Sequence, residues 1–338
     1  MSMRRWLVAS LLLVTLFCSA QQRRALLVGV ANYPEESGWR KIHADNDVSL
    51  LDKVLSNSFS IKTIVDEQAT LSNILKELAY LQNITSHGDT ILVSFSCHGQ
   101  QMIATGNEES DSLDEALIPY DARVKYSPDY HGENHLRDDV LSNCVSRIRA
   151  KAGSGGLVIV LLDACHSGDS FRNGEEMEHI RGGYPVFGPD STVRNVQKEL
   201  KNIVGFESTE GWSDVVFIGA CQSYQLNAEY KDPEDKWYGS LTYAFAKAYE
   251  EDGLNNIASL CQDIKSYVES FNKSTRQCPE FATTIDSICE IENVSAPISE
   301  EVQDSEKSNE SDFPLYGIIA VLVMVVVFLI AFYLWRKK

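Results

Sequence analysis

Two short segments of the sequence carry side chains that could do nucleophilic chemistry. One is S-C-H-G-Q, which contains His98 and Gly99, and the other is D-A-C-H-S-G, which contains Asp163 and Cys165. Each follows an apolar run typical of a buried strand. A thiol with a histidine base can attack a carbonyl carbon, and the backbone N–H groups of Gly99 and Cys165 could stabilise the resulting oxyanion. The sequence therefore indicates a Cys165–His98 dyad, although either residue alone also occurs in purely structural roles.

These residues need a scaffold that brings the two segments together. Apolar strands and amphipathic helices alternate, with strands expected at 25–30, 60–65, 90–95, 157–162 and 214–220 and helices at 44–55, 71–81, 137–150, 240–250 and 256–271. Strands that are apolar throughout are typical of a parallel sheet covered on both faces, with the helices as crossover connections. Ligands bind beyond the carboxyl ends of such strands. The pattern therefore predicts that His98 and Cys165 meet at one edge of an α/β sheet.

Both ends of the chain have the composition of targeting segments. Residues 1–20 combine a basic start, an apolar core and a small-residue end, which is the layout of a cleaved signal peptide, with an uncleaved anchor as the alternative. Residues 313–335 form an uncharged apolar stretch long enough for a transmembrane helix. The basic residues 336–338 that follow favour a cytoplasmic tail. The sequence therefore predicts a single-pass membrane protein whose main domain is extracytoplasmic.

One large domain and a stalk lie between these segments. Residues 21–294 suffice for one α/β domain, which contains a long Gly- and charge-rich insertion at 169–212. Residues 295–312 are rich in Ser, Glu and Asp and predict a flexible acidic stalk. The formal net charge of −18 argues against a nucleic-acid partner. Of the eight cysteines, seven remain after Cys18 of the signal segment, so at least one thiol is unpaired within the chain.

Several segments of the domain resemble the motifs of a known family. F-S-C-H-G-Q and L-L-D-A-C-H-S-G-D-S resemble the histidine and cysteine motifs of the metacaspases, a family of caspase-like cysteine peptidases. Other segments that resemble family motifs are R-A-L-L-V-G-V-A-N-Y-P, D-N-D-V, D-E-A-L-I-P-Y-D, G-A-C-Q-S-Y-Q-L-N-A-E and Q-C-P-E-F. The resemblance spans residues 24–289. It implies a caspase-like three-layer α/β sandwich, with a mostly parallel central sheet and helices on both faces.

The resemblance also implies roles for individual residues. Cys165 matches the nucleophile and His98 the general base, while Asp47, Ser96 and Asp163 match positions that line the pocket for the side chain before the cleaved bond. A pocket with two carboxylates favours Arg or Lys and repels an acidic side chain. The implied activity is therefore peptide cleavage after Arg or Lys, with no cofactor required for the chemistry. The alternatives are that Asp47 only bonds backbone in a first helical turn and that Asp163 only caps its strand.

Calcium is an expected activator on the same grounds. Many metacaspases are activated by calcium, and Asp114, Asp138 and Asp139 match three of their acidic ligands. Calcium takes several oxygen ligands. The fourth expected acid falls near Arg172 instead, with Asp169 close by. The alternative is that Asp138 and Asp139 serve only as acidic residues in the first turn of a helix.

The insertion and one further cysteine raise questions of regulation. The insertion contains five basic residues at which a peptidase of this specificity could cut its own chain, namely Arg172, Arg181, Arg194, Lys198 and Lys201. Regulation by self-cleavage in this region is therefore a hypothesis. Cys97 stands where the family usually has glycine before the histidine, and a second thiol there could form an inactivating disulfide.

Two other function classes stay open at this point. One is a non-enzymatic caspase-fold sensor or binding module at the membrane, and the other is an esterase or transferase that uses the same dyad. For the leading interpretation, the expected partners are protein or peptide substrates with Arg or Lys at the cleavage site, together with the membrane that holds the C-terminal helix.

Overall fold

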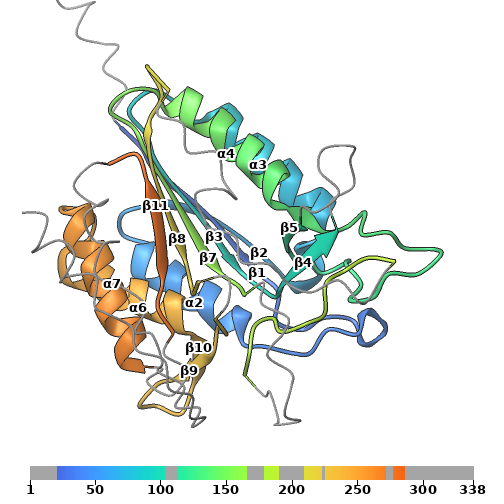
Figure 1. The fold of residues 1–338 in the computed structure, drawn as a ribbon. Helices are drawn as coiled ribbons and strands as arrows, with labels where there is room; N and C mark the ends of the chain where they lie inside the picture. Colours follow the sequence, from blue (N-terminus) through green and yellow to red (C-terminus); the bar gives the residue numbers. More distant parts are fainter. Residues whose placement is uncertain are drawn as a thin grey trace, which may run out of the picture. The chain divides into compact units, whose positions relative to one another are not determined.

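A six-stranded sheet forms the centre of the protein. The computed structural model describes residues 21–103, 113–165, 179–189, 209–222, 225–271 and 277–285. The strand order is β11-β8-β7-β3-β1-β2 (Figure 1), and the strands are β1 (Arg23–Gly29), β2 (Ser60–Val65), β3 (Thr90–Ser96), β7 (Leu157–Asp163), β8 (Asp214–Gly219) and β11 (Glu280–Thr283). All neighbours are parallel except β11, which runs antiparallel to β8 at the edge. The expectation of a mostly parallel α/β sheet is confirmed.

Helices cover both faces of this sheet, which gives three layers. α3 (Leu71–Ile84) and α4 (Asp138–Ala152) lie on one face, and α2 (Ala44–Leu55), α6 (Ser240–Asp252) and α7 (Ile257–Phe271) lie on the other (Figure 1). Successive side chains of β1 alternate between the layers: Leu26 and Val28 pack in the core under α3 and α4, whereas Leu27 packs in the core under α2 and α6. Both faces are therefore buried, which explains why these strands are apolar throughout.

The helix and strand boundaries agree closely with the sequence pattern. α2 and β2 have the predicted limits, and α3 begins after Thr70, whose side chain accepts a hydrogen bond from the backbone N–H of Asn73. The edge strand β11 of the central sheet was not expected. Five further short strands were also not expected: β4 (Gly99–Ile103), β5 (Leu113–Leu117), β6 (Leu136–Arg137), β9 (Glu229–Lys231) and β10 (Trp237–Gly239). They form two small sheets outside the central one. Their polar residues, including buried Gln100, Gln101 and Glu115, hide the apolar pattern by which strands are recognised.

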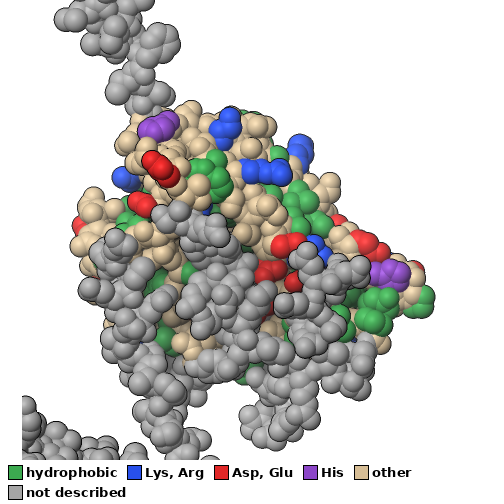
Figure 2. Space-filling model, turned by 45° about the horizontal axis from the view of Figure 1, so that its top comes forward, with side chains coloured by type: hydrophobic (Ala, Val, Ile, Leu, Met, Phe, Trp, Pro, Cys, Tyr) green, Lys and Arg blue, Asp and Glu red, His purple; other side chains and the backbone are tan. Residues whose placement is uncertain are grey.

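The predicted terminal segments lie outside the described residues. These are the signal peptide at 1–20, the stalk at 295–312, the transmembrane helix at 313–335 and the tail at 336–338. Within the part of the chain that the structure describes, no helix has both the length and the apolar character needed to cross a membrane. Figure 2 shows charged side chains of both signs scattered over one face of the described part.

Candidate active site

Two neighbouring strands bring the histidine and cysteine segments to the same edge of the sheet. β3 and β7 pair in parallel with Ser96 opposite Asp163, and the backbone N–H of Cys97 donates to the carbonyl oxygen of Asp163 at 3.4 Å. His98 and Cys165 each lie two residues beyond these strand ends. They therefore leave the sheet from adjacent strands, at the edge where parallel sheets bind ligands.

An aromatic cage fixes the imidazole of His98. Its ring stacks on Trp39 with 5.4 Å between centroids, and the rings of Tyr33 and Tyr184 each lie 5.3 Å away. Nε2 lies 2.9 Å from the carbonyl oxygen of Arg40. This oxygen can only accept a hydrogen bond, so Nε2 carries the proton and Nδ1 is the basic nitrogen. Nδ1 has no hydrogen-bond partner among the described residues. A backbone carbonyl therefore holds the ring in the tautomer that a general base needs.

Burial keeps this histidine neutral. Burial lowers the pKa of His98 to about 4, although the hydrogen bond to the Arg40 carbonyl acts in the opposite direction. Part of the burial comes from Tyr184, whose ring meets the imidazole edge-on. Tyr184 belongs to residues 179–184, a stretch of the long insertion that we call the blocking segment because of the contacts described below.

The blocking segment passes directly over the cysteine. Cys165 is 1% exposed, and its Sγ donates to the carbonyl oxygen of Gln225 at 3.0 Å. Gly182 has a φ of +133°, and a Cβ at this position would overlap the carbonyl oxygen of Cys165. Only glycine combines this backbone conformation with such a close approach. The peptide bond between Arg181 and Gly182 thus lies against the candidate nucleophile.

Main-chain hydrogen bonds hold the blocking segment in place, as they would hold an additional β-strand. Ile180 forms an antiparallel bridge with Ala228. The backbone N–H of Arg181 donates to the Asn227 carbonyl at 3.0 Å, and the backbone N–H of Glu229 donates to the His179 carbonyl at 2.8 Å. Main-chain pairing of this kind is a common way for a protein to bind an extended peptide. The blocking segment therefore occupies the site as a bound peptide would.

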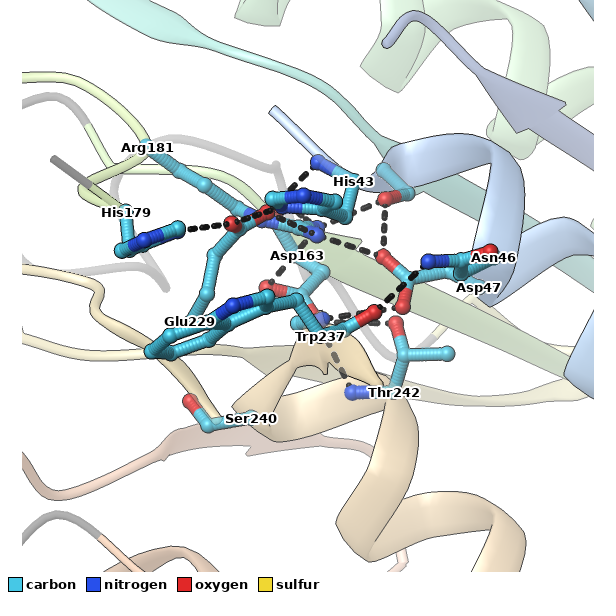
Figure 3. A network of polar contacts seen from close by, with 12 residues as sticks. His43, Asn46, Asp47, Asp163, His179, Arg181, Glu229, Trp237, Ser240 and Thr242 are labelled. Carbon is cyan, nitrogen blue, oxygen red and sulfur yellow. Dashed lines mark hydrogen bonds and ion pairs between the residues drawn. The ribbon is translucent and has the colours of Figure 1, made fainter. Parts of the chain in front are cut away.

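The guanidinium of Arg181 lies in a pocket of acidic side chains (Figure 3), which we call the acid pocket. Its Nη2 lies 2.7 Å from Asp47 and 2.9 Å from Glu229, and its Nη1 lies 3.5 Å from Asp163. Nη1 also donates to the hydroxyl oxygen of Ser96 at 2.6 Å. Arg181 and the three carboxylates that surround it are all buried. Asp47, Ser96 and Asp163 are the residues that the sequence suggested for a pocket, and here they surround one basic side chain.

Each wall of the pocket is positioned by backbone or by neighbouring polar groups. Asp47 accepts from the N–H of Gly239 at 2.9 Å and from the hydroxyl of Ser96. Asp163 accepts from the N–H and hydroxyl of Thr242, at 2.8 and 2.7 Å, and from the side-chain amide of Asn227 at 2.8 Å. These hydrogen bonds fix the carboxylates before any cation arrives, which is the preorganisation that selective ion recognition needs.

Charges within the pocket shift one another's protonation. Burial and the Asp163 charge raise the pKa of Asp47, to about 7, against the lowering by Arg181, Ser96 and the Gly239 N–H. Burial would also raise the pKa of Glu229, but Arg181 and His43 outweigh it and lower that pKa to about 2. For Arg181, burial acts to lower the pKa, and the three carboxylates more than reverse this. The acid pocket therefore stabilises a cation and is costly to leave empty.

Glu229 is the pocket residue that the sequence analysis missed. It lies in G-A-C-Q-S-Y-Q-L-N-A-E, a segment noted only for its resemblance to the family. Its side chain is fully buried, and β9, the strand that carries it, is only three residues long. An acid in a short buried strand is a signal of function once burial is known, but the sequence alone does not reveal burial here.

The three acidic residues predicted to bind calcium have separate positions and partners in the structure. Asp138 and Asp139 begin α4, where Asp138 accepts from the N–H of Asp139 at 2.9 Å and Asp139 forms an ion pair with Arg137 at 2.8 Å. Asp114 is in β5. In the described ranges, these three carboxylates do not form a cluster that could hold a metal. Of the insertion residues noted in the sequence analysis, Arg181 is described, whereas Asp169, Arg172, Arg194, Lys198 and Lys201 lie outside the described residues. The calcium site stays a prediction.

The other thiols near the site differ in character. Cys97 is buried in the core on the α3 and α4 side of the sheet, and burial raises its pKa to about 12. Cys221 donates to the same Gln225 carbonyl as Cys165, at 3.5 Å. Its hydrogen bond with Cys165 and its burial hold its pKa well above the usual range. No disulfide joins any of the six described cysteines, which are Cys97, Cys144, Cys165, Cys221, Cys261 and Cys278.

Replacing Gly182 by Ala should displace the blocking segment and expose Cys165. The added methyl group would overlap the Cys165 carbonyl, so we expect at least tenfold faster alkylation of Cys165 by iodoacetamide, followed by peptide mapping. Gly211→Ala is the matched control, because Gly211 also has a positive φ, of +84°, but a Cβ there meets nothing within 4 Å. Equal alkylation rates in the wild type and Gly182→Ala would show that the segment does not cover the thiol.

Replacing His98 by Gln tests its neutral, buried state. Because burial lowers the pKa from 6.5 to about 4, the wild type should lose stability as pH falls through this range, where the unfolded chain takes up a proton that the folded one excludes. One pKa unit corresponds to about 1.4 kcal/mol. The unfolding free energy of the wild type minus that of His98→Gln should therefore fall by up to about 3 kcal/mol between about pH 7 and about pH 4. Both chains would carry Cys165→Ala and be unfolded in urea. Parallel pH profiles would contradict the prediction.

Comparisons with known proteins find metacaspases among the similar sequences. Residues 23–172 match the family model for the metacaspase, peptidase C14 domain. Metacaspase-2 of Arabidopsis thaliana is 26% identical over 75% of this chain, and Metacaspase-1 of Mycosarcoma maydis is 24% identical over 66% of it. A crystal structure of a protein from Geobacter sulfurreducens shares the fold at 20% identity, with a TM-score of 0.52, over 78% of this chain and 93% of that chain.

The matches cover only part of the related proteins. The chain spans 58%, 43% and 34% of the length of Metacaspase-2, Metacaspase-7 and Metacaspase-4 of Arabidopsis thaliana, and 61% of the Mycosarcoma maydis relative. The family model includes both the histidine and the cysteine segments of the candidate site. These matches support a metacaspase or caspase-like family for this chain.

Proposed function

We propose that this protein is a cysteine endopeptidase that cleaves peptide bonds after Arg or Lys, with Cys165 as the nucleophile and His98 as the general base. One observation carries the proposal: an arginine of the chain itself, Arg181, lies buried among three carboxylates while the bond that follows it lies against Cys165. A pocket that binds its own arginine in this way would bind a substrate arginine by the same contacts.

The proposed reaction uses the Cys165 thiol as the nucleophile and Nδ1 of His98, the nitrogen that carries no proton, as the base. Nδ1 of His98 accepts the proton of the Cys165 thiol, and the thiolate attacks the carbonyl carbon of the residue held in the acid pocket. The oxyanion that forms is stabilised by the backbone N–H groups of Gly99 and Cys165. The imidazolium returns its proton to the leaving amine, which leaves a thioester. Water, deprotonated by His98, then hydrolyses the thioester and restores the thiol.

The described state is a blocked one. Cys165 donates its proton to the Gln225 carbonyl, and Tyr184 covers the imidazole of His98. Cleavage of another peptide therefore requires that the blocking segment first dissociates from the site or is itself cut. Both steps expose His98 to water, which removes part of the burial that lowers its pKa and brings that pKa nearer to the range where a base works best.

The proposal extends to location and activation. The apolar residues 313–335 would anchor the protein in a membrane, with the peptidase domain outside the cytoplasm and the basic tail inside. Asp114, Asp138 and Asp139 would contribute to a calcium site that activates the enzyme, together with ligands beyond the described residues. Both parts rest on the sequence rather than on the geometry of the site.

Substrates that differ only before the cleaved bond test the specificity. Peptides with Arg should be cleaved far better than peptides with citrulline, which has a similar shape but no charge. Glu229→Gln removes one charge from the acid pocket, so kcat/KM for the Arg peptide should fall about 10- to 100-fold, in line with about 1.5–3 kcal/mol for a hydrogen bond to a charged group.

The same substitution should narrow the preference for Arg over citrulline. Glu250→Gln, at an exposed position on α6, is the matched control and should leave both rates unchanged. A wild-type enzyme that cleaves the two peptides equally well would contradict the specificity. An absence of any cleavage, together with an absence of Cys165 labelling by an Arg-directed thiol-reactive peptide, would favour the non-enzymatic alternative.

Self-cleavage should occur between Arg181 and Gly182. Incubation of the purified full chain should yield a fragment whose new N-terminus is Gly182, as read by Edman sequencing or mass spectrometry. Arg181→Ala should abolish this cut, and Cys165→Ala should abolish every cut. Arg194→Ala is the control within the same insertion and should leave the Gly182 terminus unchanged. A single intact band from a preparation that cleaves Arg peptides would overturn the self-processing proposal.

A further inference from the structure

A second cluster of ligand atoms lies behind the acid pocket. His43, His179 and Glu229 offer three ligand atoms that all lie within 4.8 Å of one another, and no other such group of three occurs in the described part of the chain. Nδ1 of His43 lies 2.6 Å, and Nδ1 of His179 3.3 Å, from the same Glu229 oxygen, Oε2. Figure 3 shows the two imidazoles lying around Glu229, close to Arg181.

The two oxygens of Glu229 have separate partners. Oε1 accepts from Nη2 and Nε of Arg181, at 2.9 and 3.3 Å, and from the backbone N–H of His43 at 2.7 Å. Oε2 faces the two imidazoles. One carboxylate thus bridges the acid pocket to the histidine pair, and its orientation is fixed from the pocket side. Metal-ligand carboxylates are oriented by outer hydrogen bonds in the same way.

Charge and shape both favour a cation at this point. The buried cluster holds the carboxyl groups of Asp47, Asp163 and Glu229 against the single guanidinium of Arg181. The indole of Trp237 stacks on His179 at 3.7 Å between centroids and forms a wall behind the pair. The imidazoles themselves remain partly open, with side-chain exposures of 38% for His43 and 27% for His179. An ion can therefore reach the cluster from solvent and keep a water ligand there.

We propose that His43, His179 and Glu229 bind a divalent transition-metal ion, with Zn²⁺ as the best match, and that the ion fastens the blocking segment in the acid pocket. Two imidazoles and one carboxylate form a ligand set that zinc accepts, with water in the fourth position. Ligand atoms on a tetrahedral zinc lie about 3.4 Å apart, and the three ligand atoms here already lie within 4.8 Å of one another. Calcium does not fit, because it takes six to eight oxygen ligands.

The three ligands come from three separate segments. His43 directly precedes α2, which carries Asp47; Glu229 lies in β9; and His179 is the first residue of the blocking segment. The ion can gather all three ligands only while the segment is seated. Binding therefore stabilises the blocked state by mass action, in proportion to the logarithm of the metal concentration. This consequence rests on the proposed peptidase function, whereas the binding itself does not.

Zinc binding can be tested without any activity. The full chain carrying Cys165→Ala, which cannot cut itself or offer the Cys165 thiol to the metal, would be titrated with Zn²⁺ in competition with a chromophoric chelator. We expect one ion per chain. His43→Ala and His179→Ala should each weaken binding at least tenfold, whereas His131→Ala, which removes an exposed histidine elsewhere, should not. Circular dichroism of each variant establishes that it is folded.

The coupling to the blocking segment has its own readouts. Gly182→Ala in the same background should weaken zinc binding, because the segment is displaced from the ion's other ligands. In the otherwise wild-type chain, Zn²⁺ should slow the appearance of the Gly182 terminus, and His179→Ala should remove that sensitivity. Absence of stoichiometric zinc, or binding that survives the loss of both histidines, would overturn the site. Normal binding that leaves Gly182→Ala and self-cleavage unaffected would overturn the coupling, and neither result bears on peptide cleavage itself.

Discussion

The burial of one guanidinium among three carboxylates is the interaction on which the rest of this site depends. Taking such charges out of water costs several kcal/mol per ion, and their attraction repays it only when the geometry is good and the remaining lone pairs are hydrogen-bonded. Here Thr242, Asn227 and Gly239 satisfy those lone pairs. Loss of the guanidinium would leave a buried, uncompensated negative cluster. The acid pocket therefore strongly favours the basic side chain that it holds, and under the proposed function it would select a substrate's basic side chain in the same way.

The pocket is formed by residues from separate elements, which strand pairing and helix packing bring together, and not by one continuous segment of the sequence. Its walls come from the first turn of α2, the ends of β3 and β7, and the short strand β9. α2 packs so closely on the end of β1 that a Cβ on Gly29 would lie 2.6 Å from Cγ2 of Val48. That close packing places the neighbouring Asp47 beside Ser96. Because Ser96 and Asp163 are paired residues of adjacent strands, the pocket and the proposed dyad residues share one sheet edge.

The sequence predicts an element well where burial imposes a regular pattern of apolar residues on it. The five parallel strands of the central sheet are apolar because both their faces are buried, and their limits were predicted to within two residues, whereas the antiparallel edge strand β11 was not predicted. Asp47, Ser96 and Asp163 were identified by a resemblance, and the structure brings them together around one cation. Glu229 was missed because its role depends on a short strand, β9, that reaches the pocket from far along the chain. Arg181 was one of five basic residues in the insertion, and no local pattern distinguishes it from the other four.

The strand-like pairing of the blocking segment also affects what happens after scission. Hydrolysis of the bond before Gly182 would leave Arg181 as a new carboxyl terminus, still paired through Asn227 and Glu229 and still covalently joined to the rest of the domain. A tethered product of this kind competes at an effective concentration of the order of millimolar for a short flexible linker. Cutting therefore does not by itself clear the site. Turnover of external substrates would depend on how readily this product end dissociates and on how strongly each substrate competes with it.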